Sequence, residues 1–150
     1  MHPKKEASYC IDCGSEIDPY GRCFPPKQPD GYYINFLESA AIIQNKEGGI
    51  ILHSKDGKLY LPSALVKNKE DPSAAAIRAV KEAVGIEASN AQIVSVVGDP
   101  KRNPKGCYTC CVYKLECKEG VYTSTEYIKS HVSELAPEYS GIILKALNIC

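Results

Sequence analysis

The pattern of hydrophobic and polar positions changes at about residue 32. From there on, short apolar runs are separated by turn residues, which is typical of β-strands. The first of these runs cover residues 33–37, 40–43, 50–52 and 58–61. Gly48-Gly49 and Asp56-Gly57 stand between runs as turn signals, and Asp-Gly is a hairpin signal. This part of the chain predicts an antiparallel β-meander.

A helix is the next predicted element. Asp71 or Ser73 can serve as its N-cap, Pro72 suits its first turn, and Gly85 is a natural stop. Between these signals, the positions with helical spacing are Ala74, Ile77, Val80, Lys81 and Val84. The pattern predicts a helix that ends at Gly85.

The remainder of the chain predicts two more strands and a second helical region. The strands are expected over residues 92–97 and 108–115, with a loop rich in Gly, Pro and charge between them. Residues 124–149 are expected to be partly helical, with the best support over residues 138–147. This order of elements predicts an α+β or α/β domain and excludes a bundle or a β-sandwich.

Residues 1–31 have a different texture. They hold three cysteines, three glycines and, between Pro19 and Pro29, four prolines. A stretch with so few apolar side chains cannot bury enough surface to fold unaided. We therefore expect an N-terminal extension over residues 1–31 and a main domain over residues 32–150.

Composition narrows the classes of function. A chain of 150 residues suits one domain with a small appendage, and 18 Lys plus Arg balance 18 Asp plus Glu. This zero net charge argues against a bulk polyanion binder, so nucleic acid is not indicated as a partner. No apolar run reaches the roughly 20 residues that span a bilayer, and no signal-peptide core is seen at the N-terminus. We expect a cytoplasmic protein without membrane contact.

The stretch from Glu70 to Ile86 carries the most specific motif. Seven residues separate Glu70 from Arg78, an aliphatic residue follows at Val80, Glu82 comes next, and Gly85-Ile86 closes the stretch. This spacing resembles the Nudix box, G-x5-E-x7-R-E-U-x-E-E-x-G-U, where U is aliphatic. Residues 98–106 and 135–147 are also similar to the ADP-ribose and NADH pyrophosphatase branches of that superfamily. The resemblance implies an α+β Nudix fold, with a mixed sheet sandwiched between helices.

Three positions depart from the box. Its leading Gly is Ala64, the Glu after the Arg is Ala79, and the second paired Glu is Ala83. In the family, the box carboxylates hold Mg²⁺ or Mn²⁺ against a pyrophosphate, and Mg²⁺ favours carboxylate oxygens. The resemblance thus leaves Glu82, Glu70 and Arg78 as candidate catalytic residues, with most of the metal ligands lost. Without a metal, Arg78 and Glu82 could form an ordinary i,i+4 ion pair.

Carboxylates outside the box are a second possible source of metal ligands, because some family members take an acid from a late loop. The candidates besides Glu70 are Asp99, Glu126, Glu134 and Glu138. The loop at residues 98–106 also carries Lys101, Arg102 and Lys105. The resemblance places this loop near the substrate, so Arg102 and Lys105 are candidate phosphate-binding residues, although a solvated surface loop would have the same composition.

Eight cysteines suggest metal chemistry in a reducing compartment. Cys10 and Cys13 have the C-x2-C spacing of a zinc knuckle, and Cys23 is a third thiolate. The three resemble a worn zinc ribbon, and its fourth ligand would be His2 or come from Cys107 and Cys110. The other interpretation is a vestigial loop without metal. In a strand, Cys110 and Cys111 would point to opposite faces, where each serves as a small hydrophobe.

Three hypotheses for function follow. The first is a Nudix domain that binds a nucleoside diphosphate derivative, such as ADP-ribose or NADH, with weak or no hydrolysis. The second is an active pyrophosphohydrolase that uses Mg²⁺ or Mn²⁺ and acids outside the box. The third is a zinc-ribbon adaptor for a protein partner.

Overall fold

The computed structural model describes residues 8–9, 16–17, 36–99, 101–103 and 108–149. The chain divides into two units, residues 1–35 with 67–69, and residues 36–66 with 70–150. In the first unit, the described residues form a two-stranded antiparallel pair, β1 (Ser8–Tyr9) with β2 (Glu16–Ile17). The predicted boundary at residues 31 and 32, together with Cys10, Cys13, Cys23 and Lys105, lies outside the described residues and stays a prediction.

The second unit is built on a four-stranded mixed sheet with strand order β6-β3-β8-β7. Strand β3 runs parallel to β8 and antiparallel to β6, and β7 is antiparallel to β8. The strands are β3 (Phe36–Ile42), β6 (Ser63–Leu65), β7 (Ala88–Val97) and β8 (Tyr108–Cys117). This is the predicted α+β class with a mixed sheet.

The predicted β-meander is wrong in its pairing. Strand β3 pairs with β6 and β8, whereas β4 (His53–Lys55) and β5 (Lys58–Tyr60) form a hairpin of their own. The hairpin turn itself is as predicted, with positive φ at both Asp56 (52°) and Gly57 (75°). A two-residue turn with these angles matches strand twist, so the local signal sets the hairpin. The pairing of β3 with β6 and β8 is set by a different factor, the burial of both faces of β3 between the helix layers.

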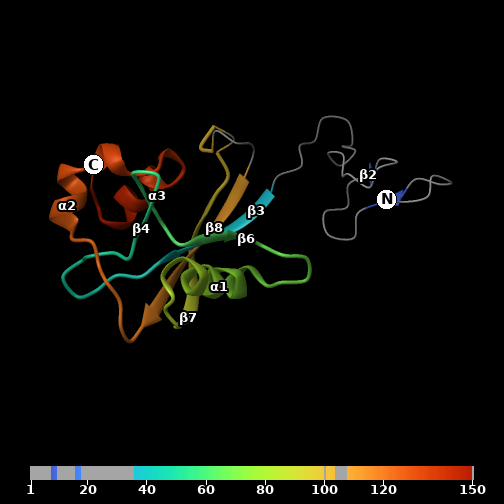
Figure 1. Cartoon of the computed structure of the whole chain (residues 1–150), viewed down its shortest axis with the longest axis horizontal. Helices are drawn as coiled ribbons and strands as arrows, with labels where there is room; N and C mark the ends of the chain where they lie inside the picture. Colours follow the sequence, from blue (N-terminus) through green and yellow to red (C-terminus); the bar gives the residue numbers. More distant parts are fainter. Residues whose placement is uncertain (1–7, 10–15, 18–35, 100, 104–107, 150) are drawn as a thin grey trace. The chain divides into compact units, whose positions relative to one another are not determined.

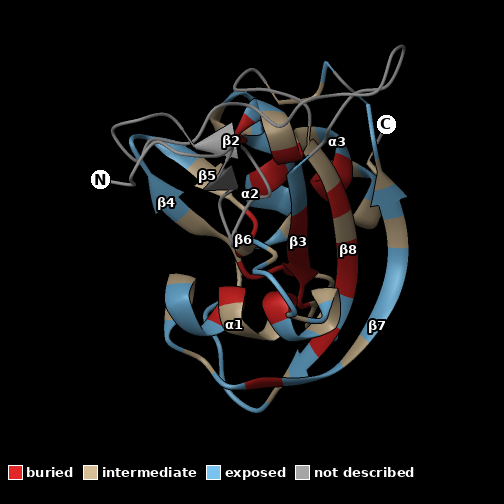
Figure 2. Cartoon of the chain, turned by 90° about the vertical axis from the view of Figure 1, so that its right-hand side faces the viewer, coloured by how far each residue is buried: buried red, intermediate tan, exposed pale blue. Residues whose placement is uncertain are grey.

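Helices cover both faces of the sheet (Figure 1). On one face lies α1 (Pro72–Val84), and the other is packed with α2 (Thr125–Ser130) and α3 (Pro137–Ala146). A short 3₁₀ turn, η1 (Val132–Glu134), joins α2 to α3. Strand β3 is buried from Glu38 to Ile42, because it lies between the two layers (Figure 2). None of these helices, in the described part of the chain, is long and apolar enough to cross a membrane.

Helix α1 begins and ends where the sequence predicts. Asp71 is its N-cap and accepts a hydrogen bond from the Ser73 amide at 2.8 Å, and Pro72 occupies the first turn. Gly85 ends the helix with φ 71°, a left-handed conformation that favours glycine. The buried positions are Ala75, Ala76, Ala79 and Val80, so the buried stripe is offset from the predicted spacing. Small alanines let the helix approach the sheet closely.

Candidate functional site

A cleft of about 510 Å³ follows β6 from α1 to the start of α3. We call it the α1 cleft. It brings together residues of β3, the β4–β5 hairpin, β6, α1, the loop before β8, and α3. The lining residues are Glu38, His53, Lys55, Tyr60, Ser63, Ala64, Leu65, Ala79, Glu82, Ala83, Asn103, Tyr108, Glu138 and Tyr139.

Arg78 binds both of the predicted catalytic glutamates. Its guanidinium donates from Nε and Nη2 to the two carboxylate oxygens of Glu70, each at 2.9 Å. Nη1 donates to Glu82 Oε1 at 3.1 Å, and Nη2 also donates to the carbonyl of Leu65 at 2.8 Å. Hydrogen bonding to Glu70 is the main cause that raises the pKa of Arg78. The i,i+4 ion pair that the sequence allows between Arg78 and Glu82 is formed, and together with the bonds to Glu70 it makes what we call the Arg78 fork.

The donor set on α1 does not fit a divalent metal. Ala79 and Ala83 line the cleft beside Glu82, at the positions where the box has carboxylates, and a methyl group cannot coordinate an ion. Glu70 and Glu82 both accept hydrogen bonds from Arg78. Mg²⁺ is held through carboxylates, waters and substrate phosphates. Among the described residues, no group of three or more His, Cys, Asp or Glu is arranged to hold a metal.

Of the four later acids considered, the structure brings Glu138 into the α1 cleft. Asp99 accepts a hydrogen bond from the Lys101 amide, and Glu134 accepts one from the Tyr127 hydroxyl. Glu126 is an exposed residue in the first turn of α2. Of these four acids, Glu138 is thus the one placed to act together with Glu82 as a metal ligand.

Glu38 is a buried carboxylate at the cleft, and sequence reasoning missed it. It is 5% exposed, and its Oε1 accepts from Arg102 Nη2 at 2.6 Å. Its Oε2 accepts from the Tyr139 hydroxyl at 3.1 Å, and that hydroxyl lies 2.6 Å from Ser63 Oγ. A charged residue in a mostly apolar strand was the available signal, because a buried charge needs a partner.

Arg102 does not project from a solvated loop. Its side chain is 8% exposed, and Nη1 donates to the carbonyl of Glu138 at 2.5 Å. The guanidinium carbon lies 5.8 Å from the centre of the Tyr139 ring. Its Nε is buried with no hydrogen-bond partner among the described residues. Arg102, which the sequence suggested as a phosphate-binding residue, therefore lies in an ion pair with Glu38.

The basic side of the α1 cleft comes from the β4–β5 hairpin. His53 and Lys55 lie on β4, and the His53 ring stacks on Tyr60 with centroids 5.7 Å apart. Burial is the main cause that lowers the pKa of His53. Tyr108 lines the same cleft, and its ring stacks on Phe36 at 5.2 Å. His53 and Lys55 lie outside the box-like stretch from Glu70 to Ile86, so the sequence offered no reason to select them as site residues.

Of the described cysteines of β8, Cys110 is a core residue, and Cys111 and Cys117 are half-buried against the core. Cys110 belongs to the hydrophobic cluster under α3, and Cys111 packs against the cluster under α1, so they point to opposite faces as expected. Burial, with a smaller effect of Glu38, raises the pKa of the Cys110 thiol. Cys110, Cys111 and Cys117 are free thiols. A buried thiol with a raised pKa stays protonated and suits packing better than metal binding.

Comparison with known proteins relates the chain to others by structure. No protein-family model matches the sequence, and no curated protein sequence matches it. Among solved structures, a NUDIX hydrolase from Nitrosomonas europaea is similar with a TM-score of 0.66 at 12% identity, over 77% of this chain and 89% of the other. The NUDIX domain of Shewanella oneidensis NrtR, complexed with ADP ribose, is similar with a TM-score of 0.66 at 14% identity, over 81% and 92%.

A third similar structure is a bifunctional NMN adenylyltransferase/ADP ribose pyrophosphatase from Francisella tularensis, complexed with AMP and a manganese ion. Its TM-score is 0.60 at 17% identity, over 79% of this chain and 42% of the other. These likenesses agree with the mixed sheet enclosed by α1 on one face and by α2 and α3 on the other. The chain has the fold of the Nudix hydrolases.

Proposed function

We propose that this domain binds a nucleoside diphosphate derivative in the α1 cleft and hydrolyses it weakly or not at all. The observation that carries the proposal is the composition of the α1 face in the cleft. Ala79 and Ala83 offer no oxygen ligand, and Glu82 is bound by Arg78. Metal assistance contributes several kcal/mol to such reactions, so its loss slows turnover by roughly a thousandfold.

The features of the α1 cleft support this ligand class. A volume of about 510 Å³ is within the range of small-molecule sites. Lys55 and His53 supply positive charge or hydrogen-bond donors for a diphosphate, and Tyr108 and Tyr60 supply aromatic surface for a base or ribose. ADP ribose is the ligand in the similar NrtR domain, which makes it the first compound to test.

The test measures binding and turnover separately. The full chain is titrated with ADP-ribose by calorimetry, and AMP release is followed with Mg²⁺ or Mn²⁺ for the wild type and Glu82→Gln. We expect binding, reduced at least about tenfold by Lys55→Gln and unchanged by Lys129→Gln on α2, whose lysine lies outside the cleft. AMP release should be at or little above background in the wild type and the same in Glu82→Gln. Absence of binding contradicts the proposed ligand, and AMP release that depends on Glu82 contradicts the proposed inactivity.

The alternative function is a working pyrophosphohydrolase, and one observation favours it. Glu138 lies in the α1 cleft with Glu82, so an ion that enters with the substrate would meet two carboxylates there once Glu82 exchanges its bond to Arg78 for the ion. In that case Glu138→Gln should abolish AMP release. A matched gain-of-function variant, Ala83→Glu, restores the second paired acid of the box. Under our proposal it raises Mn²⁺-dependent release above that of the wild type.

A further inference from the structure

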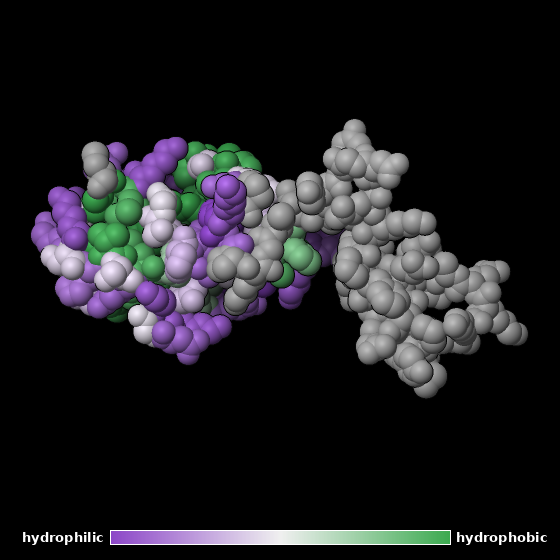
Figure 3. All heavy atoms as spheres, turned by 90° about the horizontal axis from the view of Figure 1, so that it is seen from above, coloured by the Kyte–Doolittle hydropathy of each residue, from purple (hydrophilic) through white to green (hydrophobic). Residues whose placement is uncertain are grey.

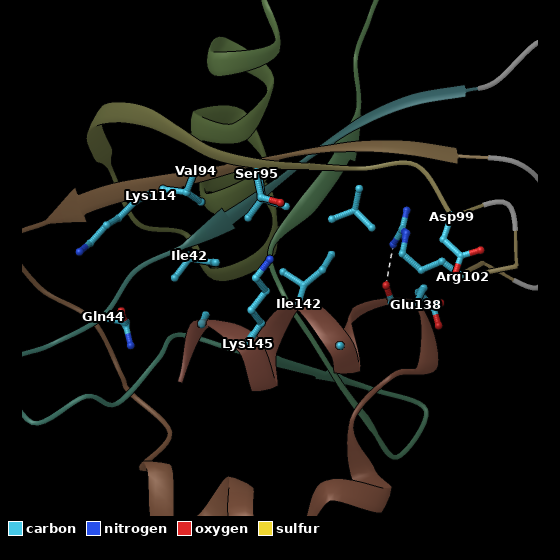
Figure 4. Close-up of a pocket in the computed structure, with 14 residues that line it drawn as sticks. Ile42, Gln44, Val94, Ser95, Asp99, Arg102, Lys114, Glu138, Ile142 and Lys145 are labelled. Atoms are coloured by element: carbon cyan, nitrogen blue, oxygen red, sulfur yellow. Dashed lines mark hydrogen bonds between the residues drawn. The ribbon is translucent and has the colours of Figure 1, made fainter. Parts of the chain in front are cut away.

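A second pocket, of about 550 Å³, lies between α3 and the strands β7 and β8 (Figure 4). We call it the α3 pocket. It lies on the face of the sheet opposite α1, and the box residues do not line it. Its lining residues are Ile42, Gln44, Val94, Ser95, Val97, Asp99, Arg102, Val112, Lys114, Glu138, Gly141, Ile142, Lys145 and Ala146.

The middle of the α3 pocket is apolar. Ile42, Val112 and Ile142 form its floor and belong to the core cluster under α3. Val94 on β7 adds an apolar wall, yet its side chain remains 54% exposed because β7 is an edge strand. Hydrophobic residues of this unit reach the surface among hydrophilic ones in the view from above (Figure 3). A ligand that covers Val94 and the floor would remove this apolar surface from water, which favours binding.

The charged residues of the α3 pocket are separated by sign. Asp99 and Glu138 lie at one end beside Arg102, whose charge is already neutralised by Glu38 (Figure 4). At the other end is Lys114, and Lys145 reaches from α3 across the apolar floor toward Ser95 (Figure 4). Neither lysine forms an ion pair within the part of the chain that the structure describes. Both lysines are exposed residues beside an apolar pocket, so an anion that enters the pocket can pair with an ammonium group without displacing an acid.

We propose that the α3 pocket binds a small amphipathic anion, a carboxylate or phosphate on a medium-length alkyl chain. The anionic group binds Lys145 and Lys114, and the alkyl chain lies over Ile42, Ile142 and Val94. The wall and floor provide the apolar contact, and the lysines fix the orientation of the ligand. This site goes beyond the nucleotide-binding function proposed for the α1 cleft.

Octanoate and octyl phosphate, below their micellar concentrations, are the probes, with octan-1-ol as the uncharged control. Each is titrated into the full chain by calorimetry. We expect at least one of the two anions to bind, and octan-1-ol to bind at least about tenfold more weakly because it lacks the charge. Comparing the affinities of octanoate and octyl phosphate shows whether the pocket prefers a carboxylate or a phosphate.

Two variants locate the site. Lys145→Gln removes the central charge and should weaken anion binding about tenfold or more, whereas Lys129→Gln on α2 removes an exposed lysine that does not line the pocket and should leave it unchanged. Gly141→Leu tests the apolar part. A Cβ at Gly141 meets no atom within 4 Å, and leucine favours helices, so the variant should fold while its side chain occupies the pocket.

The proposal is overturned if neither anion binds, or if octan-1-ol binds as tightly as the anions. The proposal is also overturned if Lys145→Gln binds the anion as tightly as the wild type does. The same holds if Gly141→Leu has a native circular-dichroism spectrum and an unchanged anion affinity. Displacement of octanoate by ADP-ribose would place both ligands in one cavity and would also overturn the separate site. ADP-ribose binding without anion binding would leave the α1 cleft proposal standing alone.

Discussion

Arg78 and Arg102 each bind glutamate, but in different surroundings. Arg78 lies on α1 with its side chain 22% exposed, and it divides its donors between Glu70 and Glu82. Arg102 lies in the loop after β7, is 8% exposed, and binds Glu38 under α3. The two glutamate partners of Arg78 are 8 and 4 residues away, whereas Glu38 is 64 residues from Arg102.

The difference separates a local, partly exposed interaction from a buried one that holds distant elements together. An ion pair that reaches water contributes little, because water and salt screen it. A buried pair brings little net gain either, but removing one partner leaves an unpaired charge in the core, which is costly. The Arg78 fork therefore affects mainly the chemistry at α1, and the Glu38–Arg102 pair holds the loop against β3 and α3.

The largest expected effect is that of Glu38→Ala. It leaves the buried guanidinium of Arg102 without its carboxylate partner and removes one hydrogen bond from the Tyr139 hydroxyl, so we expect the free energy of unfolding to fall by about 3–5 kcal/mol. Urea denaturation measures the change. In the double variant Glu38→Leu with Arg102→Met, both charges are absent, and most of the loss should be recovered. A cost below about 1 kcal/mol for Glu38→Ala would remove the distinction between the two arginines.

A smaller loss is expected for Arg78→Met. The variant deprives Glu70, Glu82 and the Leu65 carbonyl of a donor, but the side chains of Glu70 and Glu82 are 17% and 58% exposed, so water replaces part of what is lost. We expect a loss of about 1–2 kcal/mol in urea denaturation. A loss equal to that of Glu38→Ala would mean that the Arg78 fork is as structural as the buried pair.

Salt sharpens the same comparison. At 1 M NaCl the Debye length is about 3 Å, so the effect of Arg78→Met should shrink by about 0.5 kcal/mol while that of Glu38→Ala stays nearly constant. Urea denaturation of both variants at low and high salt measures the two effects. Equal salt dependence of both effects would contradict the assignment of one pair to the surface and the other to the core.

The smallest effect concerns His53 at the α1 cleft, whose pKa burial lowers below the ordinary value of 6.5. Because the unfolded chain takes up this proton at higher pH than the folded one, the free energy of unfolding should decrease as pH falls through about 6.5. His53→Gln should flatten that decrease between pH 8 and pH 5.5 when the free energy of unfolding is measured by urea denaturation across this range. An unchanged pH profile in His53→Gln would contradict the role of burial.

Local signals in the sequence were reliable where the interaction itself is local. The cap at Asp71, the stop at Gly85, the hairpin turn at Asp56-Gly57 and the pairing of Arg78 with Glu82 all join residues at most four positions apart, or depend on the backbone of one residue. The box spacing likewise predicted the fold, because its anchors lie on one helix and the adjoining loop. Such features follow from propensity and geometry alone.

Strand pairing and the cleft residues were not predictable in this way. Strand β3 pairs with β8, more than 70 positions along the chain, because both of its faces need a helix layer. Glu38 has no sequence pattern that names Arg102, Tyr139 and Ser63 as its partners. His53 and Lys55 reach the cleft only because the hairpin is folded beside β6.

The sequence by itself determined the Nudix-like spacing, the ends of α1 and the loss of acids at Ala79 and Ala83. Only the tertiary structure decided where the remaining charges are used. It placed Arg102 in the core with Glu38, and it left Lys145 facing an apolar pocket. The physical reason is that the state of a charge depends on burial and on neighbours from distant segments, and folding sets both.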